Sequence, residues 1–327
     1  MKFTFFHIAI IALQQKIKVA AAATAADFTS IGGGADLTSV TSVDISFDCP
    51  PQNQNVPNTM FTIQPSDSAD VKTSPPNLVI ASISDAGSLS FTWNPEVAST
   101  ASEGGVLIEL PAKNIQSVFV SSQNTAQILD GFTYLNDLSV QGQSIVRATF
   151  NTATTPNLVV SDQSTVNMLT TGGTYTVSVD QQSDVNLQTS TPVESFQVAN
   201  QSKLNVNGGV VSGTVTQQSD LAVTGDVSSS VSVTEQSSIT ADTISGAVTI
   251  SSQSDASASS CDNVSASDMS DCSVGGSPSV SVDVSEQSLT RTGISQCSGS
   301  SSAAVSSVVV VVAAVGSLAA IYAFSLI

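Results

Sequence analysis

Histidine is almost missing from this chain, and basic residues are scarce. The 327 residues contain one histidine, His7, and eight lysine or arginine residues against 26 acidic residues, for a net charge of −18. Because His7 lies in an N-terminal segment that we expect to be removed, the mature chain has no histidine. This excludes Ser-His-Asp and Cys-His nucleophile systems and every histidine-containing metal site. The acidic balance also disfavours nucleic acid and anionic lipid as partners.

Charged residues and cysteines are also few. Charged residues make up 10% of the chain, while Ser, Thr, Val, Gln and Asn are abundant. This composition favours strands and turns over helices. The four cysteines are Cys49, Cys261, Cys272 and Cys297, and their spacing is not a zinc pattern. In an oxidising compartment they can pair in three ways.

The N-terminus has the features of a signal peptide. Lys2 precedes an apolar run over residues 3–13, and Ala23-Thr24-Ala25 forms a small-x-small cleavage pattern. We therefore predict a signal peptide over residues 1–25. The alternative, a membrane anchor, is disfavoured because about 11 apolar residues are too few to span a bilayer.

The C-terminus predicts attachment to a membrane on the extracellular side. Small residues around Ser298 precede a polar spacer, and residues 308–327 are apolar to the last residue, with no basic residue after them. This order resembles a glycosylphosphatidylinositol (GPI) attachment signal, with Ser298 as the candidate lipid-attachment residue. A transmembrane tail is the alternative. Either places the protein at the cell surface, where Asn200 and Asn263 are candidate glycosylation sites in Asn-x-Ser sequons. Removing the signal peptide leaves five basic against 26 acidic residues, a net charge of −21.

A Gln-Ser dipeptide, or a near equivalent, recurs every 16–20 residues. Its first residue falls at Gln123, Gln143, Gln163, Gln182, Gln201, Gln218, Gln236, Gln253, Met269 and Gln287. Apolar residues stand three and five positions before this residue, and again three and five positions after it. Alternation with a period of two places these four positions on one face of two short strands. A period of this length is typical of solenoids.

The repeat predicts an all-β protein, a β-solenoid of about ten 16–20-residue coils with an N-terminal β-hairpin cap. One coil cannot bury its own apolar face, but coils stacked about 4.8 Å apart merge their faces into one core. We place the cap at residues 26–110, the solenoid at residues 111–295, and the Ser-rich spacer with the C-terminal signal at residues 296–327. The Gln and Ser positions are expected to stack as ladders at a corner, chiefly with a structural role.

One outward column carries charges. Two residues after the Gln position come Asp184, Lys203 and Asp220, which alternate in sign, and later Asp255 and Asp271. Like charges on adjacent strands repel, so Asp255 and Asp271 form a candidate cation site. Solvated surface carboxylates are the alternative. We expect no cofactor.

The stack also limits disulfide pairing. Cys49 precedes the repeats, whereas Cys261, Cys272 and Cys297 lie at their far end. Ten coils span roughly 45 Å, and a disulfide needs Cα atoms within about 7 Å. We therefore expect one disulfide among the last three cysteines, with Cys261–Cys272 favoured. A buried free thiol at Cys272, which holds an inward column position, is the alternative.

The order of elements resembles a known family of surface domains. The strand at residues 37–47, the hairpin motif Ala86-Gly87-Ser88-Leu89-Ser90-Phe91 and the step Leu107 to Pro111 before the repeats are similar to the auto-transporter adhesin head domain, or GIN domain. The resemblance covers about residues 35–260. It implies a β-helix-like stack and a role in surface adhesion, and it carries over no catalytic residues.

Three functions are compatible with this sequence. The first is a non-enzymatic surface adhesion or binding module whose partner is a polysaccharide or another cell-surface ligand, with self-association through the stack ends also possible. The second is a structural component of a cell coat or wall. The third is a polysaccharide-cleaving β-helix enzyme, which uses clustered Asp or Glu, or Lys and Arg, in a groove. The processed chain keeps only two arginines and three lysines. The acidic residues Glu96, Glu103 and Glu109 lie near one another in sequence, but no pattern pairs them.

Overall fold

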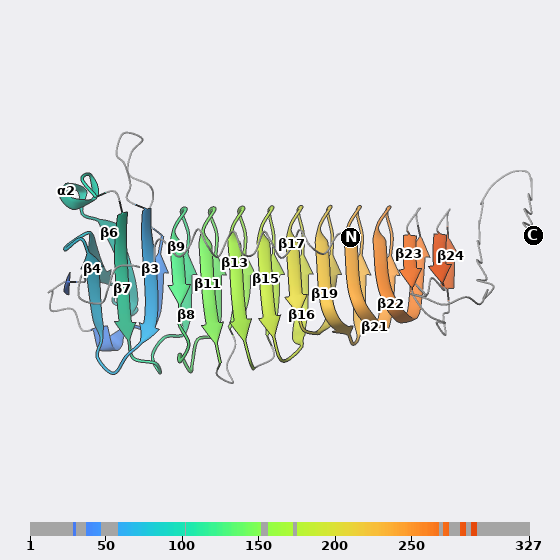
Figure 1. The fold of residues 1–327 in the computed structure, drawn as a ribbon, viewed down its shortest axis with the longest axis horizontal. Coiled ribbons are helices and arrows are strands. Elements are labelled where there is room, and N and C mark those ends of the chain that lie inside the picture. Colours follow the sequence, from blue (N-terminus) through green and yellow to red (C-terminus); the bar gives the residue numbers. More distant parts are fainter. Residues whose placement is uncertain are drawn as a thin grey trace, which may run out of the picture.

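The protein is one elongated stack of β-strands (Figure 1). A computed structural model describes residues 29–30, 37–46, 58–101, 103–151, 156–172, 175–267, 271–274, 282–285 and 289–292, with side chains as far as residue 259. Helix is limited to η2 (Leu37–Ser39) and α2 (Pro95–Ala98) within this part of the chain. The predicted all-β solenoid is confirmed. The segments predicted to be a signal peptide and a C-terminal attachment signal lie outside the described residues.

Two walls of parallel strands form the solenoid. Wall A contains β2 (Ser42–Ile45), β8 (Ser117–Val120), β10 (Asp137–Val140), β12 (Asn157–Val160), β14 (Thr176–Val179), β16 (Val193–Val198), β18 (Val210–Val215) and β20 (Ser230–Val233). Wall B contains β3 (Asn58–Pro65), β9 (Thr125–Ile128), β11 (Ile145–Phe150), β13 (Thr165–Thr170), β15 (Asp184–Thr189), β17 (Lys203–Asn207) and β19 (Asp220–Val227). Each coil of the chain contributes one strand to each wall.

The stack continues beyond β20 with longer strands. β21 (Ser238–Ile250) and β22 (Asp255–Ser267) each pair with wall B through their first half and with wall A through their second half. They are followed by β23 (Asp271–Val274), β24 (Val282–Ser285) and β25 (Leu289–Thr292). These last strands keep the parallel register, since β23 and β24 both pair with β22, and β25 pairs with β23.

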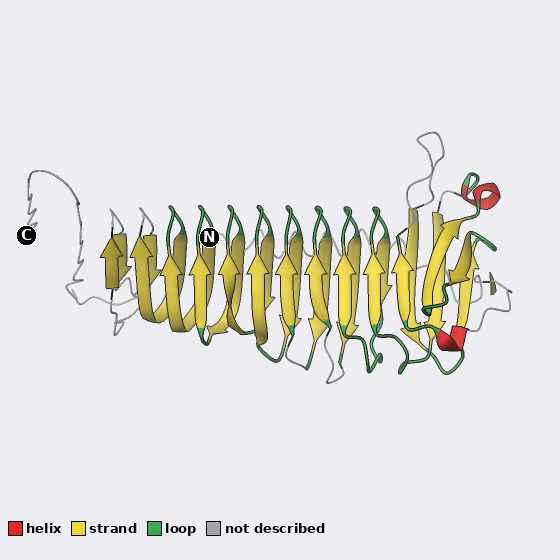
Figure 2. Cartoon of the chain, turned by 180° about the vertical axis from the view of Figure 1, so that it is seen from behind, coloured by secondary structure: helices red, strands yellow, loops and turns green. Residues whose placement is uncertain are grey.

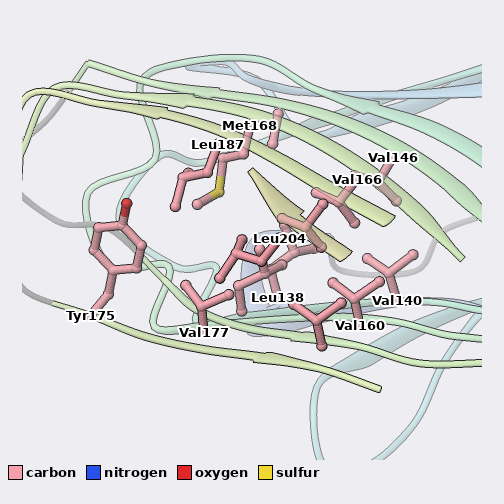
Figure 3. Packing of buried hydrophobic residues seen from close by; sticks show 14 of the residues in the cluster. Leu138, Val140, Val146, Val160, Val166, Met168, Tyr175, Val177, Leu187 and Leu204 are labelled. Carbon is pink, nitrogen blue, oxygen red and sulfur yellow. The ribbon is translucent and has the colours of Figure 1, made fainter. Parts of the chain in front are cut away.

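The core lies between the two walls, where the sequence places its apolar columns. Wall B contributes columns such as Val185, Leu204 and Leu221, which are partners in register and buried. Wall A contributes Val160, Val179 and Val198 in the same way. Figure 3 shows side chains of the two walls meeting, among them Leu204 from wall B and Val160 from wall A. The prediction that these columns form the core is confirmed by their burial.

One aromatic residue in this core carries a polar group. Tyr175 is buried, and its hydroxyl has no hydrogen-bond partner of good geometry among the described residues (Figure 3). The neighbouring hydroxyl of Thr189 already donates to the carbonyl oxygen of Thr191 at 2.6 Å. Burial raises the pKa of Tyr175 to about 12, and Thr189 offsets this only in part. A buried hydroxyl of this kind reduces stability, because it loses water without a full replacement.

The N-terminal region extends the parallel stack in an order that differs from the sequence order. β2 pairs with both β8 and β6 (Ser88–Trp93), and β3 pairs with both β9 and β7 (Glu103–Leu110). The coil formed by β6 and β7 therefore lies outside the coil formed by β2 and β3, although it follows that coil in the chain. The region between residues 42 and 110 thus contains coils of the stack as well as its cover.

Antiparallel strands cover the first end of the stack. β4 (Asp70–Ser74) pairs antiparallel with β7, and β5 (Val79–Ile83) pairs antiparallel with β6. A two-residue strand, β1 (Thr29–Ser30), pairs with β4. These hairpins occupy the edge that parallel coils leave open, and a covered edge protects against edge-to-edge association.

Candidate binding surfaces

The Gln-Ser dipeptide forms the tight corner of each coil, between its wall A strand and its wall B strand. These corners line one edge of the stack as a row of short, uniform turns (Figure 2). At eight of them the Gln residue has a φ of 63–66°, and the residue before it has a φ of 56–63°. Positive φ at two successive residues reverses the chain within a very short turn. Only one of the eight preceding residues is glycine, Gly142, so most corners hold L-residues in a left-handed conformation.

Hydrogen bonds between coils offset this conformational strain. The Nε2 atom of each Gln donates to the Oε1 atom of the next Gln, from Gln123 to Gln253, at 2.9–3.1 Å. The Gln backbone N–H donates to a carbonyl of the next corner at 2.7–3.0 Å. The predicted amide ladder is therefore present, and all seven side-chain bonds point in one direction.

The serine of each dipeptide lies inside the corner. From Ser144 to Ser254 the serines are buried, and each hydroxyl after the first accepts a hydrogen bond from the backbone N–H of the preceding serine at 3.2–3.3 Å. A small hydroxyl is the side chain that fits this site and satisfies the N–H group. The expectation that these ladders are structural agrees with this burial.

The outward surface of wall A, which we call face A, carries one charged residue over its later coils, Glu194 near the start of β16. From β16 to the second half of β21, the outward positions at the centre of each strand hold hydroxyl, amide or methyl groups. These positions are Ser195, Gln197, Ser212, Thr214, Ser230, Ser232, Ala247 and Thr249. Beyond Glu194 the result is a flat neutral surface in a chain with 26 acidic residues.

The outward surface of wall B, which we call face B, carries more charged residues than face A, where Asp137 and Glu194 are exposed. Asp184, Lys203 and Asp220 are register partners on β15, β17 and β19, as the sequence predicts. Burial raises the pKa of Asp184, and the ammonium group of Lys203 lowers it in part. The hydroxyl of Ser238 donates to Asp220 at 2.5 Å, so the column continues with a neutral group. Alternation therefore reduces like-charge repulsion along the stack.

Face B also has an apolar and basic region that sequence reasoning missed. Arg147 on β11 lies between Gln127 and Asn167 in register, and it forms no ion pair within the described part of the chain. Ile145 and Leu169 lie on the same face with 46% and 37% of their surface exposed. The signal was present in the sequence, because Arg147 holds the outward position four residues after Gln143.

The structure brings the two residues of the candidate cation site into register. Asp255 on β22 is the Cα partner of Asp271 on β23, and Asp255 is exposed. Where side chains are described, no group of three or more His, Cys, Asp or Glu residues is arranged to hold a metal ion. Cation binding by this pair stays a prediction.

The other candidate sites lie largely beyond the described side chains. Cys272 is in register with Ala256, and Cys261 with Ile244, but only their backbones are described. Cys49, Cys297 and Ser298 fall outside the described residues. Asn200 is exposed at a corner, where its side-chain amide donates to Asp180 at 2.5 Å. Asn263 is described by its backbone alone. Disulfide pairing, glycosylation and lipid attachment all stay predictions.

Glu103 and Glu109 lie six residues apart on β7, which is about 20 Å along an extended strand. Glu109 binds Lys72, with Oε2 at 2.5 Å from Nζ, and accepts a second hydrogen bond from Gln64 at 2.9 Å. The hydrogen bond to Glu109 raises the pKa of Lys72. Glu103 lies at the start of β7 and Glu96 on α2, both exposed. The Glu109 cluster joins β3, β4 and β7, so its role is structural.

No helix among the described residues is both long and apolar enough to cross a membrane.

Comparisons with known proteins give distant similarities. No protein-family model matches the chain, and a search of curated proteins finds no match. Among solved structures, a candidate adhesin from Parabacteroides merdae is similar over 82% of this chain and 95% of its own, with 14% identity and a TM-score of 0.31. A candidate adhesin from Bacteroides fragilis is similar over 78% of this chain and 91% of its own, with 12% identity and a TM-score of 0.24. The resemblance to the GIN domain stays a prediction.

Proposed function

We propose that this protein is an exported cell-surface binding module of the adhesin type that acts without catalysis. The observation that supports this most is the pair of flat outward faces, on which ordered polar side chains repeat from coil to coil. Parallel strands joined by ladders make such faces rigid, so little conformational entropy is lost when a partner binds. The expected partner is a polysaccharide or another surface ligand.

The chemistry of the chain supports binding over turnover. Hydrolysis of a glycosidic bond requires two carboxyl groups on opposite sides of the bond, roughly 5–10 Å apart. Lys72 contacts both Glu109 and its register partner Asp70, and Lys203 lies between Asp184 and Asp220 on face B. Asp255 and Asp271 are register partners on adjacent strands of one face. The mature chain is also expected to have no histidine to serve as a general base.

The test uses the full chain displayed on a host cell that otherwise does not adhere. Cells with and without the chain are mixed with beads that carry single polysaccharides, and both bead retention and the release of reducing ends are measured. Saturable retention without released sugar is the expected result. Release of shortened glycan would overturn the non-catalytic assignment. Absence of retention on every bead, together with absence of cell aggregation, would overturn the binding role and favour a structural coat.

A further inference from the structure

Face B has an uneven distribution of charge along the stack. We consider the strands β9, β11, β13, β15, β17 and β19 with the first halves of β21 and β22, eight in all, which are neighbours in register (Figure 1). Arg147 and the exposed Ile145 and Leu169 lie in the first three strands. Exposed acidic residues lie in the last three, at Asp220, Asp242 and Asp255.

This distribution makes the face complementary to its own copy when the two stacks run in opposite directions. A twofold axis parallel to the strands reverses their order, so that β15 faces β17 of a second copy. Asp184 then faces the partner's Lys203, and the partner's Asp184 faces Lys203. In the same register β11 faces the partner's β21. Arg147 then lies opposite the partner's Thr240. The partner's Asp242 is two residues farther along that strand, a separation of about 7 Å, which an arginine side chain can span.

Neighbouring arrangements are opposed by like charges. A shift of one strand in either direction places Asp184 opposite Asp184, or Lys203 opposite Lys203, of the two copies. Packing with the stacks in the same direction places each strand opposite itself, and Arg147 then faces the partner's Arg147. Like charges in contact cost free energy and reject such registers. The charges of face B therefore select one antiparallel register among these.

The area of the face is adequate for a specific contact. Eight strands about 4.8 Å apart, each exposing about 20 Å of length, give roughly 750 Å² per copy. Specific interfaces bury about 800 Å² per partner. The face is largely polar, with Ile145 and Leu169 as its main apolar contacts, so we expect a weak, reversible dimer that depends on charge.

We propose that face B binds a second copy of this chain in the antiparallel register described above. This deepens the proposed function and rests on it, because the adhesin partner would be the protein itself. Antiparallel stacks place their C-terminal ends at opposite ends of the dimer. If each chain is tethered at its C-terminus, that geometry joins molecules on two facing cells.

The test measures self-association of the secreted chain by sedimentation equilibrium at low and high salt. We expect a concentration-dependent dimer that weakens with salt, because exposed charges are screened. Arg147→Glu should weaken the dimer at least tenfold. Lys113→Glu makes the same charge change at an exposed loop residue away from the face, and it should have no effect. The double variant Arg147→Glu/Asp242→Lys restores opposite charges across the interface and should recover the dimer. Circular dichroism confirms that each variant folds.

Three outcomes would overturn the proposal: a monomer at all concentrations, an unchanged dimer in Arg147→Glu, or no recovery in the double variant. Each is separable from failure of the proposed function. A monomeric chain that still retains polysaccharide beads would leave the binding role standing and remove the second copy as its partner. A chain that neither dimerises nor retains beads would remove both.

Discussion

Replacing Gln201 by alanine removes two hydrogen bonds from the corner ladder and leaves the backbone strain in place. Gln201 donates to Gln218 and accepts from Gln182, both at 2.9 Å, with its φ at 64°. Each neutral bond contributes about 0.5–1.5 kcal/mol net, and exposed bonds fall toward the lower value. We therefore expect Gln201→Ala to lower the free energy of unfolding by about 1–2 kcal/mol.

Glycine at the same position separates strain from bonding. Gln201→Gly loses the same two bonds but relieves a left-handed conformation that costs an L-residue about 1–2 kcal/mol. Glycine also has more conformational entropy in the unfolded chain, and this lowers the free energy of unfolding by about 0.5–1 kcal/mol. The glycine variant should therefore be more stable than the alanine variant by about 0.5–1 kcal/mol.

Urea unfolding followed by circular dichroism measures both effects. Gln197→Ala is the control, because this exposed residue of β16 lies outside the ladder. The double variant Gln182→Ala/Gln201→Ala breaks three bonds, whereas the two single variants together count four. The double variant should therefore lose less free energy of unfolding than the two single variants added together. The difference should equal the contribution of one hydrogen bond, about 0.5–1 kcal/mol. A stable Gln201→Ala chain, or strict additivity, would refute a stabilising ladder.

Three further predictions follow from single residues. Tyr175→Phe should raise the free energy of unfolding, measured in urea, by up to about 1 kcal/mol, because it removes a buried hydroxyl. In the wild type, the raised pKa of Tyr175 means that the free energy of unfolding falls as pH rises from about 10 to about 12. Asp184→Asn should stabilise the monomer at neutral pH, because burial raises the pKa of Asp184 and disfavours its charged form. Thermal unfolding should show this gain in stability becoming smaller as pH falls and Asp184 of the wild type is protonated. Gly213→Ala should destabilise by about 1–3 kcal/mol or more, since its Cβ would lie 2.2 Å from the carbonyl oxygen of Phe196; Phe196→Leu should not rescue it in the same thermal assay.

The interior of the solenoid could be predicted because it depends on local alternation. A period of two around each Gln-Ser corner fixes which side chains point inward, and the burial of residues such as Val185 and Leu204 agrees. The corner ladders follow from the same spacing. One coil between successive corners places equivalent residues about 4.8 Å apart. At this backbone spacing the side-chain amide of one Gln reaches the amide oxygen of the next at 2.9–3.1 Å.

The N-terminal coils could not be predicted because they lack that dipeptide and follow a different order. β6 and β7 stack outside β2 and β3, so neighbours in space are separated by other strands in sequence. Gly213 shows a second limit. It occupies an inward column where most coils carry valine or leucine, and the reason, the close approach of Phe196, depends on the adjacent coil. Contacts between coils decide such positions, and one coil's sequence does not contain them.

Stacking of coils and a high content of acidic residues oppose each other in this fold. The way the chain reconciles them indicates which outward face is suited to binding. Each outward column repeats at strand spacing, so a carboxylate on every coil would place like charges side by side. The chain reduces this repulsion by setting Lys203 between Asp184 and Asp220 and by keeping face A neutral beyond Glu194, whereas Asp255 and Asp271 remain in register. Charge is thereby concentrated on face B in an uneven order. An uneven charge order is unnecessary for a stack alone, but it is what a surface needs to select one partner in one register.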